Sequence, residues 1–438
     1  MPSPSISPSR RSQIALDWLN FLMADVRDGV GPYLAVFLKG QEHWPSGAIG
    51  AAMAVNNVAT ALALIPAGLL VDALRCKRLL IGGAGLFVAF SAALIALLPH
   101  PAIVFTAEAA LGAAAAFLPP ALVGISLGLV GPRALPARIS RNEGFNHAGN
   151  LAGALVIGVV TRFAGLPWIF YLACGYAIAS AVVVALIPAR EIDYDVARGA
   201  AGPQYPALPL SSLLWRRDLV VFLISVTLFH LGNAAMLPLA GQVLAATHPG
   251  SDAAAMSACI IVAQAVMVVV ALVVGRMVAR GWGRKTIFLI GLAVLPLRGV
   301  LFSLVSSPLG VVAVQALDGI GAGIFGVIAI VIAADLMRGT GRVNVAQGLV
   351  ALATGLGGGA SNLLAGEIAQ HFGYPAGFLA LAGAAMLALV FFALFMRETG
   401  PPKNVMAQRE MGQEWGGAGR IVAIAPVQPA PHDDRTAP

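Results

Sequence analysis

Three charged residues stand close together inside one long apolar stretch of the sequence. Asp25, Arg27 and Asp28 lie about 11 to 14 residues into the stretch 14–38, so they lie roughly 16 to 21 Å along a helix that rises about 1.5 Å per residue. Ionisable side chains at that depth of a membrane are costly unless they pair or face water, so they mark function by default. Burial favours the neutral carboxyl and Arg27 favours the charged one, a balance that suits proton uptake and release. A static Asp–Arg pair that joins two helices is the alternative.

A second polar group is predicted in the stretch 308–334. Gln315 and Asp318 lie one helical turn apart there, next to glycines that let another helix approach. Arg298, near the middle of the stretch 286–306, is the predicted partner of Asp318. A structural ion pair and a role in transport are equally open for these residues.

Two further ionisable residues are candidates for proton handling. Glu108 is a lone acid in the apolar stretch 102–129 and is expected to handle a solute or a proton. His230 stands one turn before Asn233 in the stretch 219–245, and imidazole can exchange protons near neutral pH. If the two halves of the chain are pseudo-symmetric, these two residues lie opposite the acidic cluster of the first stretch.

Amide side chains supply most of the candidates for substrate binding. The stretch 142–162 carries two polar stripes at helical spacing, which are Asn142, Asn146 and Asn150 on one side and Glu143 and His147 on the other. Asn142 and Glu143 are expected to cap the helix, whereas the three deeper residues could bond a substrate. The further candidates, each of which could equally form a hydrogen bond between helices, are Asn56, Asn57, Asn233, Gln264, Arg298, Gln315 and Gln347.

The composition points to a lipid environment. Of 438 residues, 58% are hydrophobic and 11% are charged, against about 25% charged in a soluble domain. The formal charge of +7 is spread over short loops between apolar stretches, which indicates membrane topology and not nucleic-acid binding. Cys76, Cys174 and Cys259 lie far apart without metal-ligand spacing, so packing roles and no metal site are expected.

Twelve stretches are long enough to cross a bilayer as helices, since about 20 residues span its core of about 30 Å. Backbone groups must be bonded internally in lipid, and the stretches are too long and too continuously apolar for barrel strands. The predicted spans are 14–38, 46–72, 79–98, 102–129, 142–162, 166–188, 219–245, 253–275, 286–306, 308–334, 343–370 and 374–396. The expected fold class is all-α and integral to the membrane, with twelve transmembrane helices in two pseudo-symmetric six-helix bundles.

Arginine and lysine set the predicted orientation. With the N-terminus inside, nearly all basic residues of the loops fall on the cytoplasmic side, and only Lys39 and Arg162 fall on the other. Both termini are therefore expected in the cytoplasm, with the chain in the cell (inner) membrane as a multi-pass protein. The basic segment before the first span is expected to be retained, because the apolar stretch after it is too long and too charged for a cleaved signal.

Polar segments divide the chain into five predicted parts. The stretch 189–218 mixes charges, glycine and proline between six spans and six spans, which is typical of a linker. The residues after 397 lack a sustained apolar period and are expected to be disordered. The parts are a disordered cytoplasmic N-terminus (1–13), an N-terminal six-helix bundle (14–188), a cytoplasmic linker (189–218), a C-terminal six-helix bundle (219–397) and a disordered cytoplasmic tail (398–438).

The two halves repeat one another at an offset close to 207 residues. Gly68 and the basic cluster after it (GLLVDALRCKR) are matched by Gly275 and its cluster (GRMVARGWGRK). The other matches are 163–167 with 372–375 and Pro32 with Pro238. Such a duplication is how many transporters form a central site between two bundles that rock against each other.

The segment 68–78 resembles the loop signature of the major facilitator superfamily, and 275–285 lies where that superfamily repeats it. With twelve spans and cytoplasmic termini, the resemblance covers about residues 14–397. It implies a cytoplasmic gate formed by Gly68, Asp72, Arg75, Lys77, Arg78, Gly275, Arg280, Gly283, Arg284 and Lys285. Gly68 would permit close helix packing, and Asp72 would meet a neighbouring helix end or base. Because Ala279 stands in the second copy where Asp72 stands in the first, only the first copy is expected to hold the full charge lock. Interfacial anchoring is the alternative for the basic residues.

Two signatures of that superfamily are missing. Many members carry an arginine four residues before a glycine in span four, where this chain has Glu108 before Gly112. Span five lacks the Gly-Pro signature of drug/proton antiporters and has Gly149 and Gly153, a small-xxx-small pattern that suits close helix packing. The subfamily is therefore unassigned.

These features predict a secondary active transporter that works by alternating access, coupled to protons, with export of a small organic molecule (antiport) as the expected direction. Proton-coupled uptake (symport) of a nutrient or metabolite is the alternative, and a non-transporting membrane sensor is a remote one. No Walker-type loop or HExxH motif occurs and the seven histidines are scattered, so neither an ATP-driven pump nor an enzyme with catalytic residues is expected, and no cofactor is needed. The expected partners are a small-molecule substrate that is polar or zwitterionic, protons and lipid, and a monomer can complete the cycle.

Overall fold

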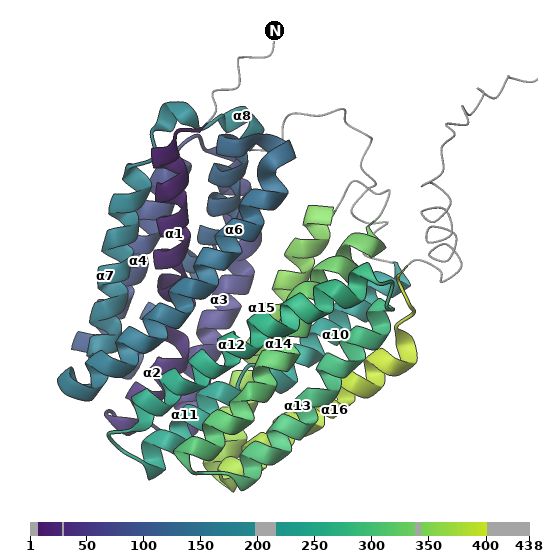
Figure 1. Ribbon diagram of the computed structural model, residues 1–438. Helices are drawn as coiled ribbons and strands as arrows, with labels where there is room; N and C mark the ends of the chain where they lie inside the picture. The colour runs from purple at the N-terminus through teal and green to yellow at the C-terminus, as the bar shows by residue number, and fades with distance from the viewer. Residues whose placement is uncertain (1–7, 29, 198–215, 338–342, 401–438) are drawn as a thin grey trace, which may run out of the picture.

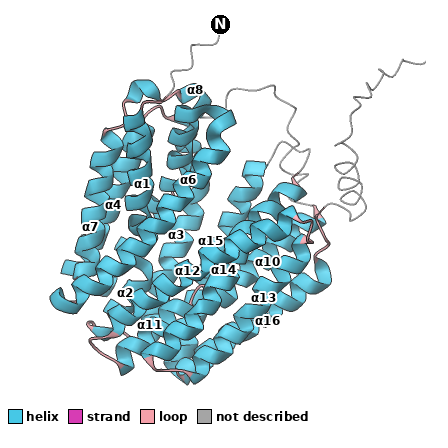
Figure 2. Cartoon of the chain, in the orientation of Figure 1, coloured by secondary structure: helices cyan, strands magenta, loops and turns pink. Residues whose placement is uncertain are grey.

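The described part of the chain consists of helices joined by short loops. The computed structural model describes residues 8–28, 30–197, 216–337 and 343–400, and none of these residues lies in a strand (Figure 2). The helices, labelled as in Figure 1, are α1 (Arg10–Asp28), α2 (Val30–Gly40), α3 (Ser46–Ala73), α4 (Lys77–Leu97), α5 (Pro101–Ala115), α6 (Leu118–Ala164), α7 (Trp168–Ala185), α8 (Tyr194–Ala197), α10 (Arg217–Asn233), α11 (Met236–Thr247), α12 (Asp252–Ala279), α13 (Arg284–Leu304), α14 (Pro308–Leu336), α15 (Val343–Phe372) and α16 (Tyr374–Phe395). A short 3-10 turn, η1 (Ala189–Glu191), precedes α8.

The predicted membrane spans match these helices. Among the described residues, eleven helical stretches are long and apolar enough to cross a membrane, and they coincide with the second to twelfth predicted spans to within several residues. The predicted first span, 14–38, is covered by α1 and α2 together, on either side of residue 29. The all-α fold with six spans in each half is therefore confirmed.

The predicted ends of the parts need adjustment. Because α1 begins at Arg10, the expectation that the chain is disordered up to residue 13 is wrong. The predicted linker begins with η1 and α8, and the N–H of Asp193 donates a hydrogen bond to the carbonyl of Gly128 at 3.0 Å. Residues 198–215 of the linker and 401–438 of the tail lie outside the described residues.

Proline and glycine reshape the predicted fourth and fifth spans. α5 ends at Ala115 and α6 begins at Leu118, because Pro119 in the first turn of α6 has no N–H to continue the preceding helix. α6 then runs on to Ala164 with a kink at Gly131, whose φ of 74° is a conformation that glycine adopts readily. Asn142 and Glu143 therefore lie inside a helix, and the prediction that they cap one is wrong.

The predicted seventh span is also interrupted. α10 ends at Asn233 and α11 begins at Met236, and Pro238 has no N–H to donate to the carbonyl four residues earlier. The N–H of Ala235 in this break donates a hydrogen bond to the hydroxyl of Ser361 at 3.0 Å. A backbone group freed by the break is thus satisfied inside the protein, as a lipid environment requires.

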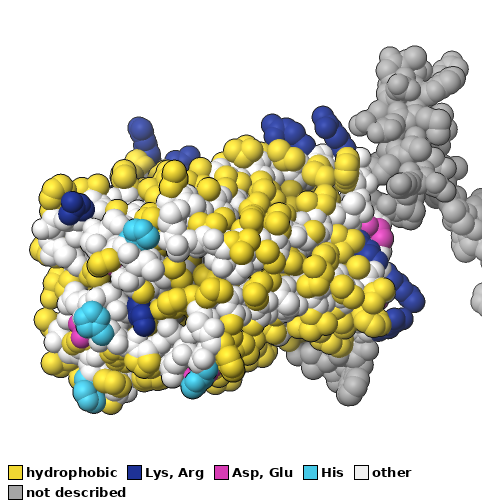
Figure 3. All heavy atoms as spheres, turned by 90° about the horizontal axis from the view of Figure 1, so that it is seen from below, with side chains coloured by type: hydrophobic (Ala, Val, Ile, Leu, Met, Phe, Trp, Pro, Cys, Tyr) yellow, Lys and Arg dark blue, Asp and Glu magenta, His cyan; other side chains and the backbone are white. Residues whose placement is uncertain are grey.

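The helices form two halves, α1 to α8 and α10 to α16 (Figure 1). Since successive spans reverse direction, α1 begins and α16 ends at the same end of the bundle, which we call the terminal face; the other end is the opposite face. The repeated loops at 74–76 and 280–283 lie at the terminal face. Seen from below Figure 1, on the side of the opposite face, the surface is largely hydrophobic or neutral, and most Lys and Arg side chains lie at the edges of the view (Figure 3).

The halves are joined near the opposite face. Tyr33 and Phe37 of α2 belong to one hydrophobic core with Ala245 of α11 and Met256 of α12. The four described hydrogen bonds between the halves are Tyr33 to Ser257, His147 to Gln264, Ser46 to Tyr374 and Gly47 to Gln370. All of them lie near the opposite face or in the middle of the spans, and the two halves diverge toward the terminal face (Figure 1).

Candidate functional site

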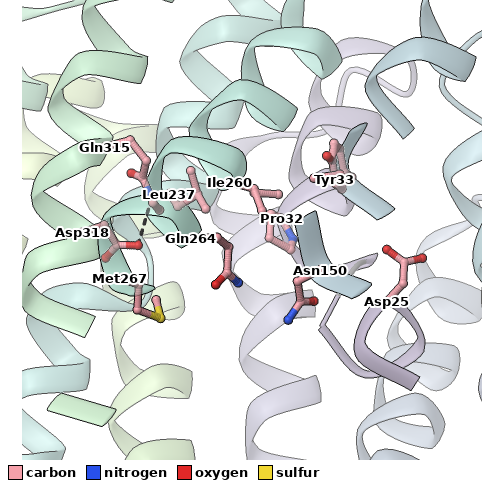
Figure 4. Close-up of a pocket in the computed structure, with 12 residues that line it drawn as sticks. Asp25, Pro32, Tyr33, Asn150, Leu237, Ile260, Gln264, Met267, Gln315 and Asp318 are labelled. Atoms are coloured by element: carbon pink, nitrogen blue, oxygen red, sulfur yellow. Dashed lines mark hydrogen bonds between the residues drawn. The ribbon is translucent and has the colours of Figure 1, made fainter. Parts of the chain in front are cut away.

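A cavity of about 250 Å³ lies between the two halves (Figure 4). The N-terminal half contributes residues of α1, α2 and α6, and the C-terminal half contributes residues of α11, α12 and α14. The lining residues are Asp25, Pro32, Tyr33, Asn150, Ala154, Leu237, Ile260, Ala263, Gln264, Met267, Gln315 and Asp318. Five of the predicted site residues, Asp25, Asn150, Gln264, Gln315 and Asp318, are therefore brought to one place.

Glycines of α6 hold α1 beside the cavity. A methyl group on Gly153 would lie 2.5 Å from Oδ1 of Asp25, and one on Gly149 would overlap the carbonyl oxygen of Phe21. The predicted close packing at these two glycines is confirmed. The Asp25 side chain is only 3% exposed, so its carboxylate is positioned by a helix crossing that has no room for a side chain. The side chains of Arg27 and Asp28 lie outside the described residues.

The C-terminal half holds a buried network around Arg298. Its guanidinium lies 2.8 Å from Oδ1 of Asp318 and donates hydrogen bonds to Gln315 at 2.8 Å and to Asn233 at 2.5 Å. The amide of Gln315 in turn donates to Asp318 at 2.9 Å, as the dashed line in Figure 4 marks. The predicted Arg298–Asp318 pair is confirmed, and the break after α10 brings Asn233 into it. Charge-assisted bonds of this kind fix both partners in one arrangement.

The halves also meet through side chains at the cavity. Nδ1 of His147 on α6 lies 3.1 Å from Oε1 of Gln264 on α12. Asn150, one turn further along α6, faces the same cavity as Gln264 (Figure 4). Amides from both halves therefore border the space in which a solute would be held.

Several predicted site residues lie away from this cavity. Glu108 is buried in α5, and the amide of Asn56 on α3 donates to its backbone carbonyl at 3.2 Å. Asn57 donates to the carbonyl of Met53 at 2.9 Å. Gln347 lies in the first turns of α15, near the terminal face. These residues are not among those that line the cavity.

His230 faces its own half of the molecule. Nδ1 of His230 lies 3.0 Å from the carbonyl oxygen of Val226, and its ring centroid is 4.7 Å from that of Phe325 on α14. His230 is not among the residues that line the cavity. Asn233, one turn later, is the residue of this pair that reaches the polar network.

Comparison with known proteins identifies the family of this chain. The family model of the Major Facilitator Superfamily matches residues 16–280 and 222–429. The chain belongs to the major facilitator superfamily. It is 42% identical over 389 residues to an uncharacterized MFS-type transporter of Mycobacterium tuberculosis, with 88% of this chain and 93% of the relative covered. The protein is thus a membrane transporter of this superfamily.

Solved structures of other transporters share its fold. The nucleoside transporter NupG superposes with a TM-score of 0.73 at 15% identity, covering 87% of this chain and 98% of that one. A POT family transporter in complex with 5-aminolevulinic acid gives 0.70 at 14% identity, covering 89% and 96%. Identities this low show that the architecture is shared and carry no information about the cargo.

The first superfamily loop of this transporter binds helix ends within its own half. Nζ of Lys77, a side chain that is 1% exposed, donates to the carbonyl of Val71 at 2.5 Å. Arg78 donates to the carbonyls of Val184 and Ala185 at 3.3 and 3.0 Å, where cationic groups stabilise a helix C-terminus. Arg75 forms an exposed 3.2 Å pair with Asp195 of α8. The side chain of Asp72 lies outside the described residues.

The second copy of the loop has a charge lock of its own. Arg284 pairs with Asp335 of α14 at 3.3 Å in a nearly buried contact, and Lys285 donates to the carbonyl of Ala393 at 2.7 Å. The carboxylate of Glu398 accepts hydrogen bonds from the N–H groups of Arg284 and Lys285 at 2.7 and 3.2 Å. The expectation that only the first copy holds the full lock is wrong, because a neighbouring helix supplies the acid that the loop lacks.

The glycines of the two loops differ in their surroundings. A methyl group on Gly68 or Gly275 would meet nothing within 4 Å, so the predicted close packing at Gly68 is wrong in this conformation. A methyl group on Gly283 would instead overlap the Glu398 carboxylate. Arg280, by contrast, follows the last residue of α12 and is exposed.

A buried ion cluster near the terminal face was not predicted. Asp17 of α1 pairs with Arg138 and with Arg141 of α6, the latter at 2.6 Å. The signal for it was the acid at the start of the predicted first span, two helical turns before Asp25. Nε of Arg138 donates to Asn142 at 2.7 Å, which is the observed role of that asparagine.

A second, smaller cavity adjoins this cluster inside the N-terminal half. Its volume is about 90 Å³, and its polar lining is Asn20, Asn142, Glu143 and Asn146. Asn146, a predicted substrate residue, is therefore separated from Asn150. The pattern Gly-x-Ser-x-Gly occurs beside it at 124–128, in the helical part of α6 before Gly131. The hydroxyl of Ser126 accepts a hydrogen bond from Asn142 at 2.9 Å. That helical setting differs from the sharp strand-to-helix turn that exposes a catalytic serine.

Sequence reasoning also missed much of the central cavity. Tyr33, Leu237, Ile260 and Met267 line it, but apolar and aromatic residues in an apolar span carry no signal that separates a cavity from a lipid-facing surface. Pro32 was noted for the repeat, and it lies in the same lining.

Proposed function

We propose that this transporter exports a small polar organic solute in exchange for protons, by alternating access. The proposal rests on the central cavity, where Asp25 of the N-terminal half and Asp318 of the C-terminal half line one space. A site built from both halves changes its access when they rock against each other. Carboxylates in such a site are the groups that a proton can reach from either side in turn.

The chemistry of the lining favours exchange. Two carboxylates, three amides and one phenol line the cavity, and no Lys, Arg or His is among the lining residues described. This set suits a cargo that carries hydrogen-bond donors or a positive charge. If the proton and the cargo use the same carboxylates, their binding is mutually exclusive, and an inward proton gradient then drives the cargo outward.

The predicted orientation completes the proposal. The terminal face carries the basic loops, which the positive-inside rule assigns to the cytoplasm. The halves are joined near the opposite face by the shared core around Tyr33 and Met256. The described conformation would then admit cargo from the cytoplasm, the first step of an export cycle, in the cell (inner) membrane.

A gradient experiment tests both coupling and direction. The full-length protein is reconstituted in vesicles loaded with a panel of labelled amines, amino acids, nucleosides and short peptides, and the outside is then acidified. Exchange predicts that at least one compound leaves the vesicles faster than from protein-free vesicles, whichever way the protein is inserted. Accumulation of a compound added outside would instead establish symport, and flux that ignores the pH gradient would contradict proton coupling.

Asp25→Asn is the matched variant for that experiment. The substitution keeps the size of the side chain and removes its ionisation, so we expect gradient-driven release to fall by about two orders of magnitude. Exchange of labelled for unlabelled cargo at equal pH should fall much less, because it requires no net proton transfer and Asp318 and the amides of the lining remain. Unchanged gradient-driven release in Asp25→Asn would remove this carboxylate from the proton pathway.

A further inference from the structure

We propose that the hydrogen bond between Tyr33 and Ser257 holds the empty transporter closed at the opposite face, and that cargo opens it by taking over the Tyr33 hydroxyl. This inference rests on the proposed exchange of cargo for protons. It assigns to Tyr33 a positioning role that links occupancy of the cavity to the movement of the halves.

The bond is buried and joins the two halves directly. The hydroxyl of Tyr33 on α2 lies 2.7 Å from Oγ of Ser257 on α12, and the two residues are 1% and 3% exposed. α6 holds Ser257 from another side, since a methyl group on Gly158 would lie 2.7 Å from its Oγ. Separation of the halves at this level must break the bond, because its two atoms belong to different halves.

The bond lies at the opposite-face end of the cavity. On α12, Ser257 precedes Ile260 and Gln264, which line the cavity, by about one and two turns, or roughly 10 Å along the axis to Gln264. Beyond it toward the opposite face, Gly241 of α11 packs against Val36 of α2. Tyr33 itself lines the cavity. Its phenol therefore borders the space for cargo and also forms the contact that closes the cavity toward the opposite face.

No other described hydrogen bond between the halves both reaches the cavity and lies on its opposite-face side. Ser46 to Tyr374 and Gly47 to Gln370 lie near the opposite face, and none of these four residues lines the cavity. The contact of His147 with Gln264 does reach the cavity, but from the side nearer the terminal face. Tyr33 is thus the cavity residue placed to sense cargo at the outer closure.

Cargo in the cavity can replace the hydrogen bond that opening breaks. In the empty transporter, separating Tyr33 from Ser257 leaves a buried hydroxyl without its partner, which disfavours opening. A cargo N–H or O–H group in the cavity can donate to the phenol oxygen, so the opened state of the occupied transporter keeps a satisfied hydroxyl. A ligand shifts such an equilibrium by the difference of its interaction with the two states, and this contact supplies a difference.

Proton leak through the empty transporter tests the proposal without a known cargo. Vesicles with a pH-sensitive dye inside and no organic solute receive an acid step outside. Tyr33→Phe and Ser257→Ala remove the bond from either side, so each should open while empty and raise the leak at least tenfold over the wild type. Tyr374→Phe removes a hydroxyl contact between the halves away from the cavity, and its leak should stay within twofold of the wild type.

A distance measurement on the same variants separates the two ideas. Spin labels at the exposed loop positions Gln41 and Ser251, with the native cysteines replaced, report opening at the opposite face. Tyr33→Phe and Ser257→Ala should populate a longer distance without cargo, and Tyr374→Phe should not. A longer distance without a leak would support the closure and sink proton exchange as the function. Distances like those of the wild type would overturn the closure itself, with or without a leak.

Discussion

The two halves of the molecule share their scaffold but not their buried polar residues. Arg78 and Lys285, 207 positions apart, both donate to carbonyls at the end of the last membrane-spanning helix of their half, α7 or α16. Gly165 and Gly373, 208 positions apart, both turn the chain before that helix, with φ of 92° and 85°. The repeat therefore preserves the contacts that set helix ends and turns.

The buried charges follow no such repeat. The positions 207 residues before Arg298 and Asp318 are Ser91 and Leu111, both buried. The position 207 residues after Asp25 is Gly232, which packs against the backbone of Ala385. Each half thus has its own set of buried polar residues on the shared scaffold, and the two sets are not related by the repeat.

The C-terminal group is an anchored network, whereas the N-terminal acid is positioned by packing. Arg298 is held by three side chains of its own half. Asp25 lies against the backbone of Gly153 on a neighbouring helix. A network with several bonds resists rearrangement, while a carboxylate placed by a helix crossing moves when the helices move. The crossing of α1 and α6 therefore determines where the Asp25 carboxylate lies.

Removal of Arg298 should have the largest effect on stability. Arg298→Leu leaves Asp318 as a buried charge without its cation, and loss of one partner of a buried pair costs about 3–5 kcal/mol. We expect most of the variant to be lost from the folded fraction in detergent, as measured by gel filtration and thermal unfolding. Arg298→Leu combined with Asp318→Leu should recover much of the folded fraction.

An exposed pair supplies the control for that prediction. Arg75 and Asp195 have side chains 69% and 60% exposed, so Arg75→Leu should change stability by about 0–1 kcal/mol. Equal losses for Arg75→Leu and Arg298→Leu would show that burial does not set the difference between the two groups.

A methyl group at the helix crossing should have an intermediate effect. Gly153→Ala places Cβ 2.5 Å from Oδ1 of Asp25, so α1 and α6 must separate, at a cost of about 1–3 kcal/mol. Gradient-driven transport should slow by about tenfold, because the acid is displaced. Gly175→Ala in α7 is the matched control, since a methyl group there meets nothing within 4 Å and alanine favours a helix. Equal transport rates in the two variants would contradict positioning of Asp25 by packing.

The sequence predicted the helices well because apolar length alone determines which segments cross a bilayer. It also predicted the Arg298–Asp318 pair, since a buried arginine needs an acid at similar depth. Its errors lie where tertiary contacts decide. The chain 130–141 continues as helix because Gly131 absorbs the change of direction, and a Gly alone does not show whether a helix stops or bends.

The lining of the cavity was predictable only in part, for a related reason. Asp25, Asn150, Gln264, Gln315 and Asp318 are polar residues in apolar spans, so their types revealed them. Tyr33 and Ser257 are ordinary residues of an apolar helix, and only the meeting of α2 with α12 joins them. His230 does not line the cavity, because the repeat predicts which helix borders the cavity but not which face of that helix does.

The two halves also differ in what their capping glutamates bind. A lower pH should reveal this difference as a small effect. Glu191 and Glu398, 207 positions apart, both cap the start of a helix. Glu398 accepts N–H groups of α13, and Glu191 accepts hydrogen bonds from Ser12 and Ser9 at the start of α1. The hydroxyl of Ser12 and the N–H of Ser9 hold the pKa of Glu191 below its usual range.

A lowered pKa in the folded state means that this contact stabilises the start of α1 above the ordinary pKa of glutamate, about 4.3. The contribution is lost as the pH falls through the lowered value, because protonation removes the negative charge that strengthens these hydrogen bonds. Hydrogen exchange of the Ser12 and Gln13 amides, corrected for intrinsic rates, should therefore accelerate severalfold between pH 6 and pH 3.5. In Glu191→Gln the exchange should be fast at both values, while the amides of Arg284 and Lys285 keep the protection that Glu398 gives them. An unchanged pH response in Glu191→Gln would show that another acid docks α1, and the parallel between the two capping glutamates would then be limited to their positions in the repeat.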